Sequence, residues 1–279
     1  MNFTKATIIK RKLADLAALI YEDRLEIPQW ETRHATFLGE DGYTDSVADA
    51  PIRVGERWTC RDDFTRWFSA DVTVPESFSG KPLALDLEFG GEGIVRVNGG
   101  IVSAITSYLV PCGATRTRVL LADAAAAGTA YHVEIEAHLN YMEFAEFRHK
   151  GAVSIEYTAR TAALVTINPM VESYYFDIRT GLEGMETLKN PLEKIAKSGA
   201  VLPEDILRLI ESCSKDSYYY EKVAEAVVAS ITCVDFDFEK EEILRSIPKA
   251  AEVYRRKMAE ISGQTHGIIK FVGQAHIDT

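Results

Sequence analysis

The sequence has no apolar run of membrane-spanning length, no signal-peptide pattern and only four cysteines in 279 residues. A transmembrane helix needs about 20 consecutive apolar residues, and the N-terminal segment lacks a small-residue cleavage site. No two cysteines form a C-x-x-C pair, which favours free thiols over a disulfide framework or a zinc knuckle. We therefore expect a cytoplasmic chain. The four cysteines are Cys60, Cys112, Cys213 and Cys233.

Positive charge is also scarce. The chain has 42 Asp and Glu against 31 Lys and Arg, a formal net charge of −11. Nucleic acids and anionic membranes bind proteins that present a basic surface. The densest basic stretch, Lys10-Arg11-Lys12, is short and is expected on the solvated face of a helix. Neither nucleic acid nor a membrane is therefore expected as a partner.

The first 52 residues are predicted to be a helix followed by a loop. Apolar residues recur at helical spacing over residues 6–24, which indicates one buried stripe. Pro28 ends that pattern. The polar stretch that follows contains Gly39, Asp41-Gly42 and Pro51, and these turn residues favour a long surface loop.

Residues 53–168 are predicted to form a β-sandwich domain, because the apolar period changes to two. No helical pattern separates the strands, and Asn98-Gly99-Gly100 is a strong hairpin-turn signal. Short, half-buried strands of this kind favour an antiparallel, jelly-roll-like sandwich. The predicted strands are Phe68–Val74, Leu83–Phe89, Ile94–Val97, Arg118–Leu121, Tyr131–Leu139 and Val153–Thr158.

Residues 169–265 return to the helical period and are predicted to form a helical connector, so the fold class is α+β. Pro248 is expected to kink or restart the last helix, with Ser246 as its cap. The predicted helices run through Val171 and Met185, from Pro203 to Ile210, through Tyr219 and Ile231, and through Ile243 and Ile261.

The segment 266–279 contains the residues with the clearest chemical potential. Ile268–Val272 is an apolar run typical of a buried strand, and His276 and Asp278 follow it two positions apart. Alternate residues of a strand point to one side, so an imidazole and a carboxylate would converge. Such nitrogen and oxygen ligands suit Zn²⁺. By spacing alone, an ordinary polar strand end is favoured over a metal site.

Phe271 to Thr279 resembles the opening strand of the catalytic barrel in α-mannosidases of glycoside hydrolase family 38. The resemblance covers most of the chain, because residues 171–262 are similar to the helical connector that precedes that barrel. Further matches to the non-catalytic sandwich of the family are Trp58, Trp67-Phe68, Thr73-Val74-Pro75, Phe78-Ser79-Gly80-Lys81 and the segment from Gly91 to Gly99.

The resemblance implies that His276 and Asp278 are two ligands of a catalytic zinc that holds the mannose ring. The other ligands, the nucleophile and the acid would lie beyond Thr279, and a retaining glycosidase needs two carboxyl groups. We therefore expect the non-catalytic N-terminal region of a zinc-dependent retaining α-mannosidase, ending with the first strand of the catalytic barrel. An α-mannoside would be its substrate only through the catalytic domain. The chain alone is not expected to hold zinc or to be an enzyme.

Two alternatives remain open: a free-standing carbohydrate-binding module and a structural sandwich that forms a homo-oligomer. A carbohydrate-binding module needs exposed aromatics on a sheet face, whereas these strands place Asp, Glu, Ser and Thr outward. His132, Glu134, Glu136 and His138 share one strand face, which favours a solvated surface over a metal site. The runs Tyr174-Tyr175-Phe176 and Tyr218-Tyr219-Tyr220 favour packing between helices over a sugar platform.

Overall fold

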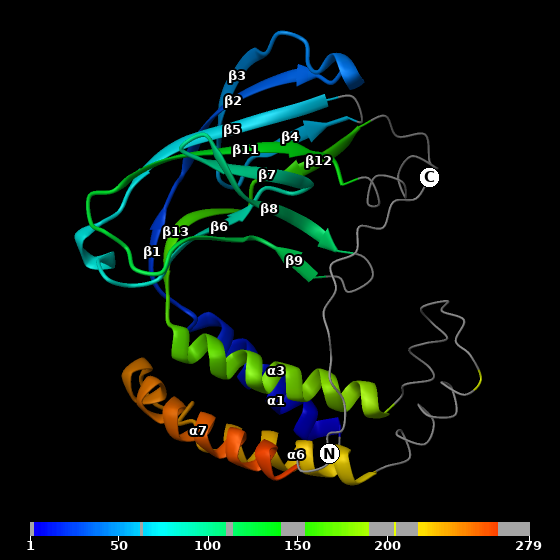
Figure 1. The fold of residues 1–279 in the computed structure, drawn as a ribbon, viewed down its shortest axis with the longest axis vertical. Coiled ribbons are helices and arrows are strands. Elements are labelled where there is room, and N and C mark those ends of the chain that lie inside the picture. Colours follow the sequence, from blue (N-terminus) through cyan, green and yellow to red (C-terminus); the bar gives the residue numbers. More distant parts are fainter. Residues whose placement is uncertain are drawn as a thin grey trace. The chain divides into compact units, whose positions relative to one another are not determined.

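The computed structural model describes residues 3–61, 64–109, 114–140, 154–189, 204 and 217–261. The chain divides into two compact units. The sheet unit comprises Leu19–Pro169, and the helical unit combines Met1–Ala18 with Met170–Thr279. The strands of the sheet unit and the helices of the helical unit are labelled in Figure 1.

The sheet unit is an antiparallel β-sandwich, which confirms the predicted α+β fold class. One sheet has the order β3 (Val47–Arg53), β2 (Gln29–Thr36), β5 (Phe64–Thr73), β11 (Ala130–His138), β7 (Glu92–Val97), β8 (Gly100–Leu109) and β9 (Ala114–Arg116). The other has the order β1 (Tyr21–Glu26), β13 (Thr161–Ile167), β6 (Leu83–Glu88) and β10 (Arg118–Ala122). A small third sheet pairs β12 (Ile155–Thr158) with β4 (Arg57–Cys60).

One hydrophobic core joins the two larger sheets. Phe68, Val133 and Ile135 enter it from the seven-stranded sheet, and Leu85 and Leu164 enter it from the four-stranded sheet. All five side chains are fully buried. Their spacing is the period-two alternation that the sequence shows for β5, β6 and β11. The inner faces of both sheets are thus apolar, and the outer face of the seven-stranded sheet carries the polar residues.

The predicted hairpin turn is confirmed. Asn98 and Gly99 connect β7 to β8 with φ angles of 51° and 82°. Positive φ at both central residues is the type I′ geometry, which matches the twist of paired strands.

The predicted surface loop before residue 52 is wrong. The helix ends at Ala18, and the following residues form β1, β2 and β3 with the short 3-10 helix η1 (Gly39–Asp41). Trp30 enters the core from β2, but the next inward position is the polar Thr32, whose hydroxyl donates to the Ala50 carbonyl, so the sequence shows little apolar alternation here. Pro51 lies in β3 at the sheet edge, where a missing N–H costs no ladder hydrogen bond.

The helical unit contains α1 (Phe3–Ala18), α3 (Pro169–Lys189), α6 (Ser217–Ile231) and α7 (Lys240–Ile261). Three of its helices are tied together by a buried hydrogen-bonded chain. The Tyr174 hydroxyl on α3 lies 2.9 Å from Ser230 Oγ on α6, which donates to the Ala250 carbonyl on α7 at 2.7 Å. Burial raises the pKa of Tyr174 above its ordinary value. This packing confirms the predicted role of Tyr174.

Of the two expectations for Pro248, the restart is wrong, because α7 continues through it from Lys240 to Ile261, and the kink stays a prediction. Ser246 does not cap a helix start: its hydroxyl donates to the Ile243 carbonyl and accepts from the Asp235 N–H. Buried side chains on both sides of Pro248 hold the helix against its neighbours. Apart from Glu204, which is helical, the helix predicted from Pro203 lies outside the described residues, as does the strand predicted at 268–272.

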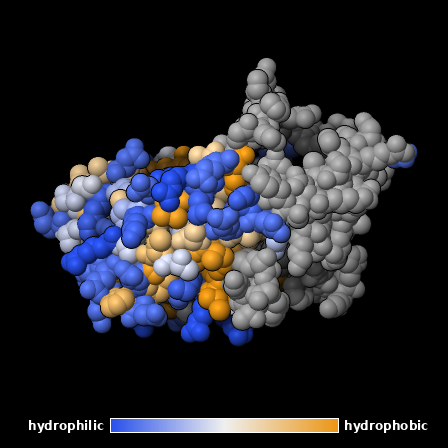
Figure 2. All heavy atoms as spheres, turned by 90° about the horizontal axis from the view of Figure 1, so that it is seen from below, coloured by the Kyte–Doolittle hydropathy of each residue, from blue (hydrophilic) through white to orange (hydrophobic). Residues whose placement is uncertain are grey.

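Hydrophobic side chains also occur on the surface. Figure 2 shows them in patches among hydrophilic ones. Among the described residues of the helical unit, the large apolar ones that are exposed are Ile8, Met170, Phe176 and Phe238. No described helix is both long enough and apolar enough to cross a membrane.

Cys60 is expected to resist alkylation in the folded protein. Its side chain is fully buried, and burial raises the pKa of the thiol to about 12. Only the thiolate is nucleophilic, so almost none of Cys60 is reactive in mildly alkaline buffer. Mass spectrometry after iodoacetamide treatment, with and without urea, measures the difference. Equal labelling rates in both conditions would contradict the burial, and the half-buried Cys233 is the internal comparison.

Candidate functional site

The outer face of the seven-stranded sheet aligns side chains from several strands into two transverse rows. In one row, the paired residues are His138 and Glu92, then Glu92 and Thr106, then Thr106 and Arg116. Directly paired residues point to the same face of a sheet. Four residues that lie far apart in the sequence are therefore neighbours across β11, β7, β8 and β9.

The second row lies two positions along the strands and is more apolar. Trp67 pairs with Glu136, Glu136 with Ile94, and Ile94 with Ala104. Ile94 is 38% exposed although it lies in the middle of the sheet. An apolar floor next to a polar row is typical of a small-molecule site.

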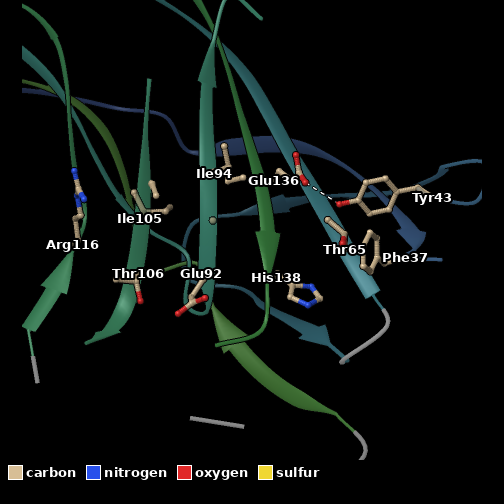
Figure 3. A pocket seen from close by; sticks show the side chains of 12 residues that line it. Phe37, Tyr43, Thr65, Glu92, Ile94, Ile105, Thr106, Arg116, Glu136 and His138 are labelled. Atoms are coloured by element: carbon tan, nitrogen blue, oxygen red, sulfur yellow. Dashed lines mark hydrogen bonds between the residues drawn. The ribbon is translucent and has the colours of Figure 1, made fainter. Parts of the chain in front are cut away.

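A cavity of about 530 Å³ lies over both rows. Figure 3 shows Phe37 and Tyr43 on one side of it and Arg116 on the opposite side. The lining residues are Phe37, Tyr43, Thr65, Glu92, Gly93, Ile94, Ala104, Ile105, Thr106, Arg116, Glu136 and His138.

Phe37 and Tyr43 come from the connection between β2 and β3, where they form an isolated antiparallel bridge. Their rings lie 5.3 Å apart, and the Tyr43 ring meets Trp67 edge-on at 5.1 Å. Both remain accessible, with exposed fractions of 47% and 41%. Trp67 thus supports the Tyr43 ring from the sheet, and Tyr43 in turn contacts Phe37.

A network of alternating charges holds Tyr43 in place. The Tyr43 hydroxyl donates to Glu136 at 3.0 Å, and Arg96 pairs with the other oxygen of that carboxylate. Arg33 pairs with Glu134 at 3.0 Å and covers Trp67, with 4.3 Å between the guanidinium and the ring centre. Partial burial, and then the hydrogen bond to Glu136, raise the pKa of Tyr43.

The polar row offers both donors and acceptors. Glu92 accepts a 2.8 Å hydrogen bond from the Asn140 side-chain amide through one of its two oxygens. His138 Nδ1 lies 3.0 Å from the Phe64 carbonyl, which can only accept, so Nδ1 carries a proton. In the neutral ring, Nε2 is then an acceptor. Arg116 is exposed and has no ion-pair partner among the described residues.

The four polar residues predicted on one strand face do share it, but the cavity uses only Glu136 and His138. His132 instead contacts Asp71, at 2.8 Å from Nδ1. Within the described ranges, no three His, Cys, Asp or Glu side chains are grouped so as to hold a metal ion. The side chains of Tyr218 and Tyr219 lie outside the described part of the chain, as do His276 and Asp278.

Sequence reasoning missed Phe37 and Tyr43, which it assigned to a surface loop, and it missed Thr106 and Arg116. The available signal was the pair of aromatics flanking Gly39 and Gly42, which is the composition of a short hairpin connection. Glu92 and Gly93 fell within the segment from Gly91 to Gly99, without an assigned role.

No family model matches this sequence, and no curated protein matches it. Solved structures with weak likeness include a Ruminococcus gnavus β-glucuronidase in complex with D-glucuronic acid: identity 13%, TM-score 0.29, covering 43% of this chain and 22% of that one. The same enzyme in complex with uronic isofagomine is 12% identical with a TM-score of 0.34, and the match covers 53% of this chain and 29% of that one. A Faecalibacterium prausnitzii β-glucuronidase is 12% identical with a TM-score of 0.32, and the match covers 53% of this chain and 32% of that one. The chain spans less than a third of the length of these structures, and likeness at this level does not identify a function.

Proposed function

We propose that this chain is the non-catalytic N-terminal region of a zinc-dependent retaining α-mannosidase. The observation that carries the proposal is the order of the parts. A β-sandwich is followed by packed helices, and then by an apolar segment ending in His276-Ile277-Asp278. This is the order that the resemblance to glycoside hydrolase family 38 implies. The free thiols of Cys60 and Cys233 favour a cytoplasmic location.

The donor chemistry of His276 and Asp278 fits a zinc site in part. Imidazole nitrogen and carboxylate oxygen are both zinc ligands, but a catalytic zinc normally has three protein ligands and one open position. These two residues would therefore share the metal with a further domain. Bound there, zinc would supply a Lewis acid that holds two sugar hydroxyls. The role of the present chain is to position the two ligands and to support that domain.

The test is hydrolysis of an aryl α-mannoside together with zinc analysis. The 279-residue chain is expected to show neither turnover nor bound zinc. In the complete protein, His276→Ala and Asp278→Ala are each expected to lower zinc affinity and activity by at least about a hundredfold, since even groups that only orient ligands contribute 10–100-fold. His132→Ala, on the exposed sheet face, is the matched control. Full zinc content and normal rates in both ligand variants would contradict the assignment.

A second candidate function is carbohydrate binding by the sandwich itself. The observation that favours it is the exposed pair Phe37 and Tyr43 beside the cavity. A carbohydrate-binding module needs exposed aromatics, and the sequence pattern of the strands places polar residues outward instead. A purely structural, homo-oligomerising module is the remaining alternative. Sedimentation of the purified chain tests that alternative directly.

A further inference from the structure

We propose that the cavity on the outer face of the seven-stranded sheet binds an uncharged pyranoside, with Phe37 and Tyr43 against the ring and the row from His138 to Arg116 against its hydroxyls. The inference rests on the second candidate function and names its site and its ligand class. It is independent of a catalytic zinc. All residues concerned belong to the sheet unit.

The size and rigidity of the cavity suit a small ligand. Its volume of about 530 Å³ lies within the range of roughly 300–1,000 Å³ that is usual for small-molecule sites. Tyr43 is fixed by Trp67 below it and by Glu136 at its hydroxyl. A ligand therefore does not have to order the Tyr43 ring on binding. Binding then avoids much of the side-chain ordering entropy that association usually costs.

The distribution of polarity matches a sugar ring. A pyranoside has an apolar face of C–H groups and a rim of hydroxyls that both donate and accept. The cavity offers aromatic and aliphatic surface at Phe37, Tyr43 and Ile94. The adjacent row offers a carboxylate acceptor at Glu92 and guanidinium donors at Arg116. A carboxylate and a guanidinium together satisfy hydroxyls in both of their roles.

The charge balance favours an uncharged ligand. Two carboxylates, Glu92 and Glu136, line the cavity, and Arg116 also lines it. Arg96 pairs with Glu136 beneath it. These four groups have no net charge, so a uronate, phosphate or ammonium ligand gains little from them. An apolar peptide is also disfavoured, because it would desolvate Glu92 and Arg116 without replacing their hydrogen bonds.

The experiment is titration of the folded 279-residue chain with methyl α-mannoside, methyl β-glucoside and glucuronate, followed by NMR shifts and calorimetry. At least one neutral glycoside is expected to bind in the millimolar range and more tightly than glucuronate. Tyr43→Ala and Glu92→Gln are each expected to weaken binding by about tenfold. Tyr43→Phe keeps the ring and is expected to weaken it less. His132→Ala lies outside the cavity on the same face and is expected to bind normally.

Thermal melting shows whether each variant folds, and Phe37→Ala replaces Tyr43→Ala if the latter does not. Tighter binding of glucuronate, binding of an apolar peptide instead, binding unchanged by Tyr43→Ala or Phe37→Ala, or no saccharide binding would each overturn the inference. Saccharide binding in a complete protein without α-mannosidase activity would overturn the primary proposed function alone. α-Mannosidase activity in a complete protein that binds no saccharide at this cavity would overturn the inference alone and leave the primary proposed function standing.

Discussion

Replacing Gly91 by alanine is expected to lower the free energy of unfolding of the sheet unit by about 3–5 kcal/mol, among the largest effects of a single substitution. Gly91 has a φ of 63°, and an added Cβ would lie 2.3 Å from the His138 carbonyl oxygen. That oxygen is backbone and cannot rotate away, so β11 would have to shift. The Tyr157 ring, 3.2 Å from the same Cβ, closes the other side. Urea unfolding followed by tryptophan fluorescence reports on this unit alone, since Trp30, Trp58 and Trp67 all belong to it.

Gly128→Ala separates the clash from backbone strain. Gly128 has a φ of 78°, but no atom lies within 4 Å of the position that an added Cβ would take. It therefore carries only the cost of a left-handed alanine, about 1–2 kcal/mol. Equal losses in the two variants would mean that the close approach of Gly91 to β11 contributes nothing. If Gly91→Ala is the more destabilising variant, it should also disturb the row from His138 to Arg116, because His138 belongs to β11, the strand that must move.

Replacing Trp58 is expected to separate a hydrogen bond from packing in the core. The Trp58 side chain is 2% exposed and packs edge-on against Phe68 at 5.2 Å and tilted against Tyr157 at 5.2 Å. Its Nε1–H donates to the Phe89 carbonyl at 2.7 Å. Trp58→Ala leaves a large cavity and should cost about 3–5 kcal/mol. Trp58→Phe keeps most of the volume but leaves the carbonyl unsatisfied, which should cost about 1–3 kcal/mol.

Leu120→Ala is the matched control for this pair, because Leu120 lies on β10 with 64% of its surface exposed. Its replacement should change stability by less than about 0.5 kcal/mol. The same urea measurements compare all three variants. If Trp58→Phe and Trp58→Ala were equally stable, the packing of the indole would not be the main contribution. If Trp58→Phe matched the natural protein, the hydrogen bond to Phe89 would contribute nothing measurable.

The strands that could be predicted from the sequence are those with one apolar and one polar face. β5, β6 and β11 alternate in this way, and their predicted positions are confirmed. β13 shows no alternation because nearly all of its residues are buried, on both faces. β1 reads as polar because it is an edge strand of the four-stranded sheet. Period two detects a half-buried strand, and it fails where both faces are covered or one edge is open.

The candidate site could not be predicted because it depends on register. Glu92, Thr106 and Arg116 become neighbours only when β7, β8 and β9 pair with the observed offsets. One irregularity lies between Val95 and Arg96, and a shift of a single residue would turn the row toward the core. Local sequence patterns contain no information on such offsets. His276 and Asp278 are the reverse case: a short motif suggests their chemistry, and no described residue tests it.

The helical unit combines a segment that precedes the sheet unit in the sequence with one that follows it, and this has a consequence for the order of folding. α1 is synthesised before the sheet unit, yet Leu16 is fully buried and Lys12 lies over the ring of Phe236, which is synthesised after the sheet unit is complete. The pairing of Tyr21 with Ile167 brings the two ends of the sheet unit side by side. Once the sheet unit has folded, its two ends are held a short, fixed distance apart. The helical segments on either side of it in the sequence then meet without closing a very long flexible loop, whose entropic cost rises with its length. Damage to the sandwich should therefore weaken the hold of the later helices on α1, even where no helical residue has changed.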